Sequence, residues 1–231
     1  ATQVALTAAL VAALRRLWPS FDPKSPKASL QRYNPAISAV VSEFSRASIS
    51  MSADHFDVLR DQAGVTRRFT TPIIDPAPEA AIEAYLNAAV DGLLEQMQPE
   101  IDAIIAQAES AAQQFVLDAG RNEILAAVGA DSEAKGWARV VKPGACSFCL
   151  MLAIRGPVYR SRKTASFRAH QKFNGRGGDC QCTAEPVFGA YEASAHVRAA
   201  QRLYSDVTES GMTPAEMRRA FRRAVDAQRA A

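Results

Sequence analysis

The sequence has few aromatic residues, few histidines and no apolar run long enough to cross a bilayer. Aromatic side chains make up 7% of its 231 residues, while alanine is abundant. Only three histidines are present to serve as a catalytic base, and no stretch has room for a separate protease domain. We therefore expect no proteolytic activity.

We expect the first apolar stretch, residues 2–18, to be neither a signal peptide nor a membrane span. It is too short to cross a bilayer, and Arg15 and Arg16 follow the apolar run instead of preceding it. We expect no targeting segment, no membrane partner and a protein made and kept in a reducing cytoplasm, which argues against disulfides.

Acidic residues are missing altogether from residues 134–178, although the net charge of the chain is only +3. The preceding block, residues 75–133, is the reverse: Arg121 is its only basic residue. Such a dipolar chain suits stacking of one copy on another, or contact with DNA at one end and protein at the other. The alternative is a solvated acidic helix face followed by a basic shell around the cysteines.

Only four cysteines are present, and they form two close pairs. Cys146 and Cys149 make a C-x-x-C pair after a Pro-Gly turn, and Cys180 and Cys182 make a C-x-C pair before an expected strand. A C-x-x-C turn directs two sulfurs toward one point, and alternate residues of a strand share one face. The four cysteines therefore predict one structural zinc site, and His170 is the only histidine near enough in sequence to replace one of them.

The basic residues around the cysteines favour the thiolate form that zinc requires. They also predict a surface for nucleic acid or an acidic partner, made of Arg155, Arg160, Arg162, Lys163, Arg168, Lys172 and Arg176. Disulfides, a redox pair, or four small buried side chains are the alternatives to a metal site. A thioredoxin-like redox enzyme would have repeated βαβ units, and a zinc deaminase would have His-x-Glu or Cys-x-Glu before Pro-Cys-x-x-Cys; the sequence has neither.

Apolar side chains recur at three- and four-residue steps over much of the chain, which predicts a mainly α fold. Residues 2–18 predict an amphipathic helix, and residues 19–29 an exposed linker. We expect a helix to begin at Asn34-Pro35 and a second short helix, residues 52–62, to end at Gly64. Residues 65–74 are expected to be extended.

The longest apolar stripe, residues 79–128, predicts two helices or one kinked at Pro99, ending at Gly129. The stripe packs against the chain's own first helices or serves oligomerisation. A strand is expected at Trp137. Residues 191–208 have helical character, and Thr213-Pro214-Ala215-Glu216 is a capping box that begins a final, arginine-rich helix. That helix contacts nucleic acid, an acidic protein surface or solvent.

Three segments follow from these patterns. Residues 1–133 form a helical domain with long helices, residues 134–190 a small zinc-stabilised α+β module, and residues 191–231 a C-terminal helical segment.

Four short runs carry a resemblance to a known family: W-A-R-V from Trp137, C-x-F-C-x-M-L-A from Cys146, R-G-P-V-Y from Arg155, and the C-x-C before Pro186. With the residues around them, from 120 to 188, they resemble the Mu F-like or head-morphogenesis family, the minor head proteins of tailed bacteriophages, in its actinobacteriophage form. That family often carries a histidine three residues before C-x-C. Gly177 stands there instead, which favours four cysteine ligands.

The resemblance implies a structural virion component, few in copy number, assembled near the portal, with no catalytic activity. Its implied partners are the portal or major capsid protein, packaged double-stranded DNA and further copies of itself. We therefore predict a minor capsid protein of a tailed phage, assembled in the bacterial host cytoplasm. The alternatives are a zinc-stabilised nucleic-acid-binding protein and a C-x-x-C thiol redox protein.

Overall fold

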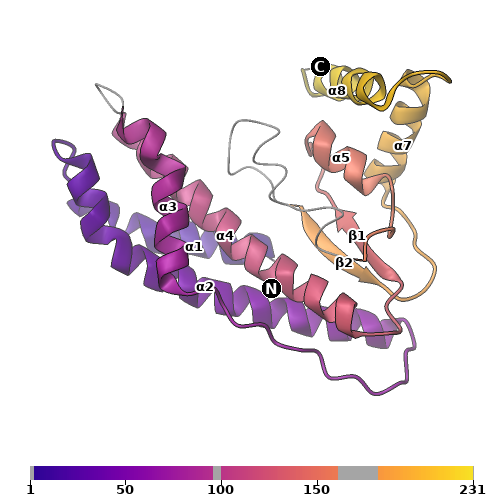
Figure 1. Cartoon of the computed structure of the whole chain (residues 1–231), viewed down its shortest axis with the longest axis horizontal. Helices are drawn as coiled ribbons and strands as arrows, with labels where there is room; N and C mark the ends of the chain where they lie inside the picture. The colour runs from indigo at the N-terminus through magenta and orange to yellow at the C-terminus, as the bar shows by residue number, and fades with distance from the viewer. Residues whose placement is uncertain (1–2, 96–99, 161–181, 231) are drawn as a thin grey trace.

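A computed structural model describes residues 3–95, 100–160 and 182–230, and the protein is mainly helical with one small sheet, as predicted. Four helices form an elongated bundle: α1 (Gln3–Arg15), α2 (Pro26–Gln62), α3 (Glu79–Leu94) and α4 (Ile101–Ala130). Figure 1 shows α2 and α4 running together along the long axis, with a smaller α+β part at one end. Among the helices in the described ranges, none combines the length and the apolar character needed to span a bilayer.

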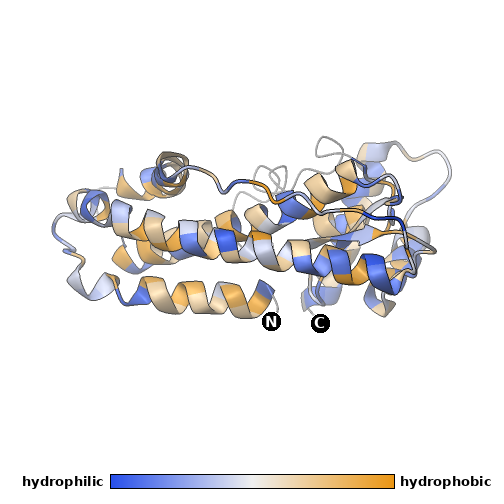
Figure 2. Ribbon diagram, turned by 90° about the horizontal axis from the view of Figure 1, so that it is seen from below, coloured by the Kyte–Doolittle hydropathy of each residue, from blue (hydrophilic) through white to orange (hydrophobic). Residues whose placement is uncertain are grey.

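The predicted apolar stripe forms the core of this bundle. Ile82 and Leu86 of α3 and Ile104 of α4 are buried in one cluster with Leu10 and Leu14 of α1. In Figure 2, orange apolar segments of the helices lie against one another inside the bundle. The stripe therefore packs against the chain's own helices, and its central residues do not form a free oligomerisation face.

Two separate helices, α3 and α4, carry this stripe, so the prediction of two helices is confirmed and the alternative of one kinked helix is not. Pro99, the predicted break, lies outside the described residues. The end of α4 is one residue beyond the predicted Gly129, at Ala130.

Helix α2 is longer than predicted. It begins at Pro26, inside the predicted linker, and a short 3-10 helix, η1 (Trp18–Ser20), precedes it. The predicted helix start at Asn34-Pro35 is wrong, because both residues lie inside α2. Pro35 removes one helical hydrogen bond, but it lies on the exposed side, while the buried Asn34 Nδ2 donates to Asn87 Oδ1 of α3 at 2.9 Å.

The predicted boundary between helices at residue 52 is also absent, since α2 continues through it without interruption. The predicted end of the helix is confirmed. Helix α2 ends at Gln62, and Gly64 has a φ of +72°, the left-handed conformation that favours glycine after a helix.

Residues 65–78 form an extended connecting segment that returns along α2 to the start of α3 (Figure 1). Residues 65–74 are extended as predicted. Thr71 Oγ1 donates to Asp57 Oδ1 of α2 at 2.6 Å, and the Ile74 backbone N–H donates to Glu123 Oε2 of α4 at 3.0 Å. Side chains of two helices therefore hold this segment in place.

The sheet is small and lies against the end of the bundle. Strands β1 (Gly136–Val140) and β2 (Thr183–Val187) pair antiparallel, with Ala138 opposite Glu185, and the strand predicted at Trp137 is confirmed as part of β1. One core cluster joins Phe56 of α2 and Ile124 of α4 to Trp137 and to helix α5 (Ser147–Ala153). The α+β part therefore shares a core with the long helices.

Helices α7 (Ala195–Val207) and α8 (Pro214–Ala230) complete the described chain, beside α5 (Figure 1). The predicted capping box is confirmed at the start of α8. The Thr213 backbone N–H donates to Glu216 Oε2 at 2.7 Å, and the Glu216 backbone N–H donates to Thr213 Oγ1 at 3.3 Å. Hydrogen bonds from the Thr213 backbone and side chain lower the pKa of Glu216.

Helices α1, α2 and α4 are closely packed around Gly120. A Cβ atom on Gly120 would lie 2.5 Å from Ser48 Oγ, 2.6 Å from Ser52 Oγ and 2.8 Å from Gln3 Nε2. Those side chains are linked to one another: Ser48 Oγ donates to Gln3 Oε1 at 3.1 Å, and Gln3 Nε2 donates to Ser52 Oγ at 3.2 Å. Even one methyl group at Gly120 would disturb the contact of α1, α2 and α4.

Gly120→Ala is expected to lower the free energy of unfolding by about 1–3 kcal/mol, the usual cost of overpacking a close contact. Gly129→Ala is the matched control, since Gly129 lies on the same helix, is exposed, and has nothing within 4 Å of an added Cβ. The control should raise stability by up to about 1 kcal/mol, because alanine favours the helix. Urea unfolding followed by circular dichroism measures both, and equal shifts would contradict the prediction.

Candidate functional site

The C-x-x-C pair lies where the sequence placed it, directly after a turn. Residues 143–144 form the turn, and Gly144 has a φ of +77°. Cys146 precedes the first residue of α5 and is half-buried, while Cys149 lies inside the helix and is 1% exposed. Both cysteines therefore face toward the protein rather than toward solvent.

Cys182, the second cysteine of the C-x-C pair, directly precedes β2 and is buried. Its carbonyl oxygen accepts a hydrogen bond of 2.7 Å from Arg121 Nε of α4. Cys149 and Cys182 belong to one core cluster, and Cys146 packs against it. The fold thus brings the two halves of the predicted site, distant in sequence, into one part of the molecule.

The described residues do not by themselves make a metal centre. Within residues 3–95, 100–160 and 182–230, no three His, Cys, Asp or Glu side chains are placed to share a metal ion. Cys180 and His170 lie outside these ranges. A zinc site of four cysteines would therefore depend on Cys180, and it stays a prediction.

Two of the seven predicted basic binding residues, Arg155 and Arg160, are described, and both are exposed. Arg162, Lys163, Arg168, Lys172 and Arg176 lie outside the described residues. Arg139 of β1, which belongs to the same basic stretch, is fully buried in the core. The basic stretch is therefore not uniformly a surface feature.

The acidic block is not uniformly solvated either. Glu109 is buried and accepts a 3.0 Å hydrogen bond from Trp18 Nε1. Glu123 is fully buried on α4; its Oε2 accepts from Ile74, and its Oε1 has no hydrogen-bond partner among the described residues. Burial raises the pKa of Glu123, an effect that the Ile74 hydrogen bond partly opposes. The interpretation of the whole block as a solvated face is wrong for these two residues.

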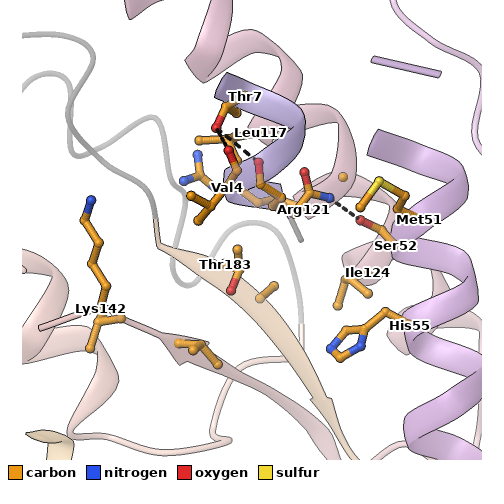
Figure 3. A pocket seen from close by; sticks show the side chains of 15 residues that line it. Val4, Thr7, Met51, Ser52, His55, Leu117, Arg121, Ile124, Lys142 and Thr183 are labelled. Atoms are coloured by element: carbon orange, nitrogen blue, oxygen red, sulfur yellow. Dashed lines mark hydrogen bonds between the residues drawn. The ribbon is translucent and has the colours of Figure 1, made fainter. Parts of the chain in front are cut away.

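A cavity of about 400 Å³ opens between the start of α1, the C-terminal halves of α2 and α4, and the sheet (Figure 3). Its wall is mostly apolar, with Val4, Leu117 and Ile124 among the lining residues. His55 stands at one side and Lys142 at the other. His55 is exposed on α2. The cavity was not predicted, because its walls come from five separate segments of the chain.

Arg121 also lines this cavity, and sequence reasoning missed its role. Its side chain is buried, with Nη1 donating to Asp118 Oδ1 at 2.8 Å while Nε holds the Cys182 carbonyl. It therefore positions the start of β2 on α4. One feature of the sequence could have indicated this role: Arg121 is the only basic residue in the acidic block, and a lone arginine among carboxylates readily forms ion pairs with them.

A family model described as VG15 protein matches residues 1–207 of the chain. The matched range contains the helical bundle, all four cysteines and both strands, and it ends at the last residue of α7. No curated protein and no solved structure matches the chain.

Proposed function

The chain belongs to the VG15 family of phage proteins, and on that premise we propose that it is a minor capsid, or head-morphogenesis, protein of a tailed bacteriophage. Its role in this proposal is structural. It would be incorporated into the head near the portal and act through binding, without catalysis. The family match supports a virion component, and the Mu F-like resemblance supports the more specific role.

The observation that carries the proposal is the packing of the resembling runs into one unit. The W-A-R-V run lies in β1, and the R-G-P-V-Y run ends at Tyr159, whose carbonyl oxygen accepts a 2.9 Å hydrogen bond from the Trp137 backbone N–H. The ring centroids of Trp137 and Tyr159 are 4.9 Å apart. The C-x-F-C-x-M-L-A run forms α5, in the same core cluster. These three runs, which lie within residues 137–159, therefore pack as one structural unit.

We propose the portal or the major capsid protein as the direct partner. The unit containing β1, β2 and α5 sits at one end of an elongated bundle, so the bundle extends away from it (Figure 1). This shape suits a protein that anchors at one end and reaches a second surface with the other. Self-association is the alternative to these partners. The copy number measured in the next experiment distinguishes the two arrangements.

Mass spectrometry of purified phage particles tests the proposal. We expect the chain to be present in the head fraction at a small copy number relative to the major capsid protein, and to remain there after tails are removed. The control is an abundant host cytoplasmic protein, which should be lost when the particles are purified. Synthesis of the chain during infection without its incorporation into particles would overturn the proposal.

A further inference from the structure

Helix α8 is the part of the described chain that carries the densest exposed positive charge. It begins at Pro214, beyond the range matched by the family model, which ends at residue 207. Five arginines of this helix are exposed: Arg218, Arg219, Arg222, Arg223 and Arg229. The sequence predicts an arginine-rich final helix, and the structure shows on which side of it the arginines lie.

The orientation of α8 is set by its apolar side. Phe221 is fully buried and Val225 nearly so, in a cluster with Met151 of α5 and Ala200 of α7. The rings of Phe221 and Tyr204 meet edge to face, with centroids 5.4 Å apart. These contacts, with the capping box at Thr213, prevent α8 from rotating about its axis.

The five arginines project from the rest of the helix circumference, outside this apolar side. Successive helical residues turn by roughly 100°, so the five arginines fall within an arc of about 140° that excludes Phe221 and Val225. Along the axis, Arg218 and Arg229 are about 16 Å apart. We call these five side chains the α8 arginine face. It is a strip of positive charge fixed by packing and directed outward.

This face costs the helix stability. Arg218 and Arg222 are like charges four residues apart, as are Arg219 and Arg223, and such pairs destabilise a helix. One ion pair offsets them: Arg222 Nε lies 3.6 Å from Asp226 Oδ2, with both side chains 54% exposed. A helix side that contacts only solvent ordinarily carries charges of both signs. The concentration of one sign indicates an anionic partner.

We propose that the α8 arginine face binds the phosphate backbone of double-stranded DNA without reading its sequence. Guanidinium groups pair well with phosphate, and a strip of them matches a regularly charged polyanion. The arc holds no amide or aromatic side chain that would distinguish bases. The proposal does not depend on the virion role, because it concerns binding by the isolated chain.

An acidic protein is a poorer fit to the same face. Protein interfaces are centred on buried apolar and aromatic side chains, whereas the exposed large apolar residues of the described chain all lie outside α8. The arc of the helix that holds the α8 arginine face contains only arginine, alanine and aspartate. Electrostatic contact with phosphate needs no apolar centre.

Fluorescence anisotropy with labelled random-sequence duplex DNA, over 50–200 mM salt, tests the proposal. If all five arginines contact phosphates, the affinity of the wild type should fall about 500-fold across that range. The test variant carries Arg218→Gln, Arg219→Gln, Arg223→Gln and Arg229→Gln, which keeps Arg222 with Asp226. Its affinity at the lowest salt should be at least about 100-fold weaker, with a loss of only about 3- to 4-fold over the series.

The control variant removes the same charge elsewhere, with Arg16→Gln, Lys24→Gln, Lys27→Gln and Arg32→Gln, all at exposed positions. It should bind DNA like the wild type. The α8 variant should melt no lower than the wild type, because its like-charge pairs are gone, so weakened binding will not reflect unfolding.

Equal affinity of both variants would overturn the proposal, since total charge and not the α8 face would then govern binding. A wild type that fails to bind duplex DNA at 50 mM salt would also overturn it. If the wild type instead binds poly-glutamate and the α8 variant does not, the partner is an acidic protein.

Discussion

Arg60→Leu is expected to lower the free energy of unfolding by about 3–5 kcal/mol, because it leaves the Asp131 carboxylate buried without its partner. Arg60 Nε lies 2.8 Å from Asp131 Oδ2, and the two side chains are only 7% and 2% exposed. The same guanidinium donates to the carbonyl oxygens of Val65 and Arg67. Arg60 therefore joins the end of α2, the connecting segment and the residue after α4, and one substitution removes all three contacts.

The matched control is Arg67→Leu. Arg67 pairs with Glu133 at 3.4 Å in the same region, but its side chain is 68% exposed and that of Glu133 41%. Exposed ion pairs contribute at most about 1 kcal/mol, so the control should have little effect. Urea unfolding with unchanged m-values measures both, and a loss at Arg60 no larger than that at Arg67 would contradict the prediction.

The double variant Arg60→Leu/Asp131→Leu identifies the cause of the loss. If the buried, unpaired carboxylate dominates, removing it should recover most of the stability. If the hydrogen bonds to Val65 and Arg67 dominate, the double variant should remain as unstable as Arg60→Leu.

The second large effect is the loss of zinc. We propose that Cys146, Cys149, Cys180 and Cys182 bind about one zinc ion per chain, and that Cys149→Ser abolishes this binding. A structural zinc site contributes on the order of 10 kcal/mol to folding, so the part containing β1, β2 and α5 should unfold without it. The N-terminal halves of α2 and α4 belong to a separate core cluster, so most of the helical circular dichroism signal should persist.

Trp137 offers a local readout of that unfolding. It is fully buried in the cluster that contains Cys149 and Cys182. The protein has only two tryptophans, and the other, Trp18, lies in the helical core. In a Trp18→Phe background, both a chelator and Cys149→Ser should shift the Trp137 emission to the red, and the chelator should cause no further shift in the Cys149→Ser variant.

The alternatives to zinc give different results in the same experiment. Elemental analysis that finds no metal in protein purified without chelators would end the zinc proposal. An emission shift caused by a reducing agent and not by a chelator would indicate a disulfide. If neither reagent has an effect and Cys149→Ser costs only about 1–3 kcal/mol, the cysteines are ordinary core residues.

Local sequence patterns predicted most of the helical content correctly, because they depend on neighbours in the chain. The apolar stripe of residues 79–128, the end of α2 before Gly64, and the Thr213 capping box all follow from spacings of three to four residues or from backbone conformation. The start of α2 was wrong because Asn34-Pro35 is a good local start signal. Packing overrode that signal, since Asn34 finds a partner on α3 and Pro35 lies toward solvent.

Sequence alone also determined the candidate site as a set of residue types: two cysteine pairs, a basic stretch and an acidic one. It did not show which charges are buried, because burial depends on segments far apart in the chain. Glu123 is buried and accepts a hydrogen bond from the Ile74 backbone, and Arg139 of β1 is fully buried. Arg121 donates to the Cys182 carbonyl oxygen, 61 residues away in the sequence. Tertiary structure likewise decided that the α8 arginines face outward together, since the packing of Phe221 and Val225 sets the rotation of that helix.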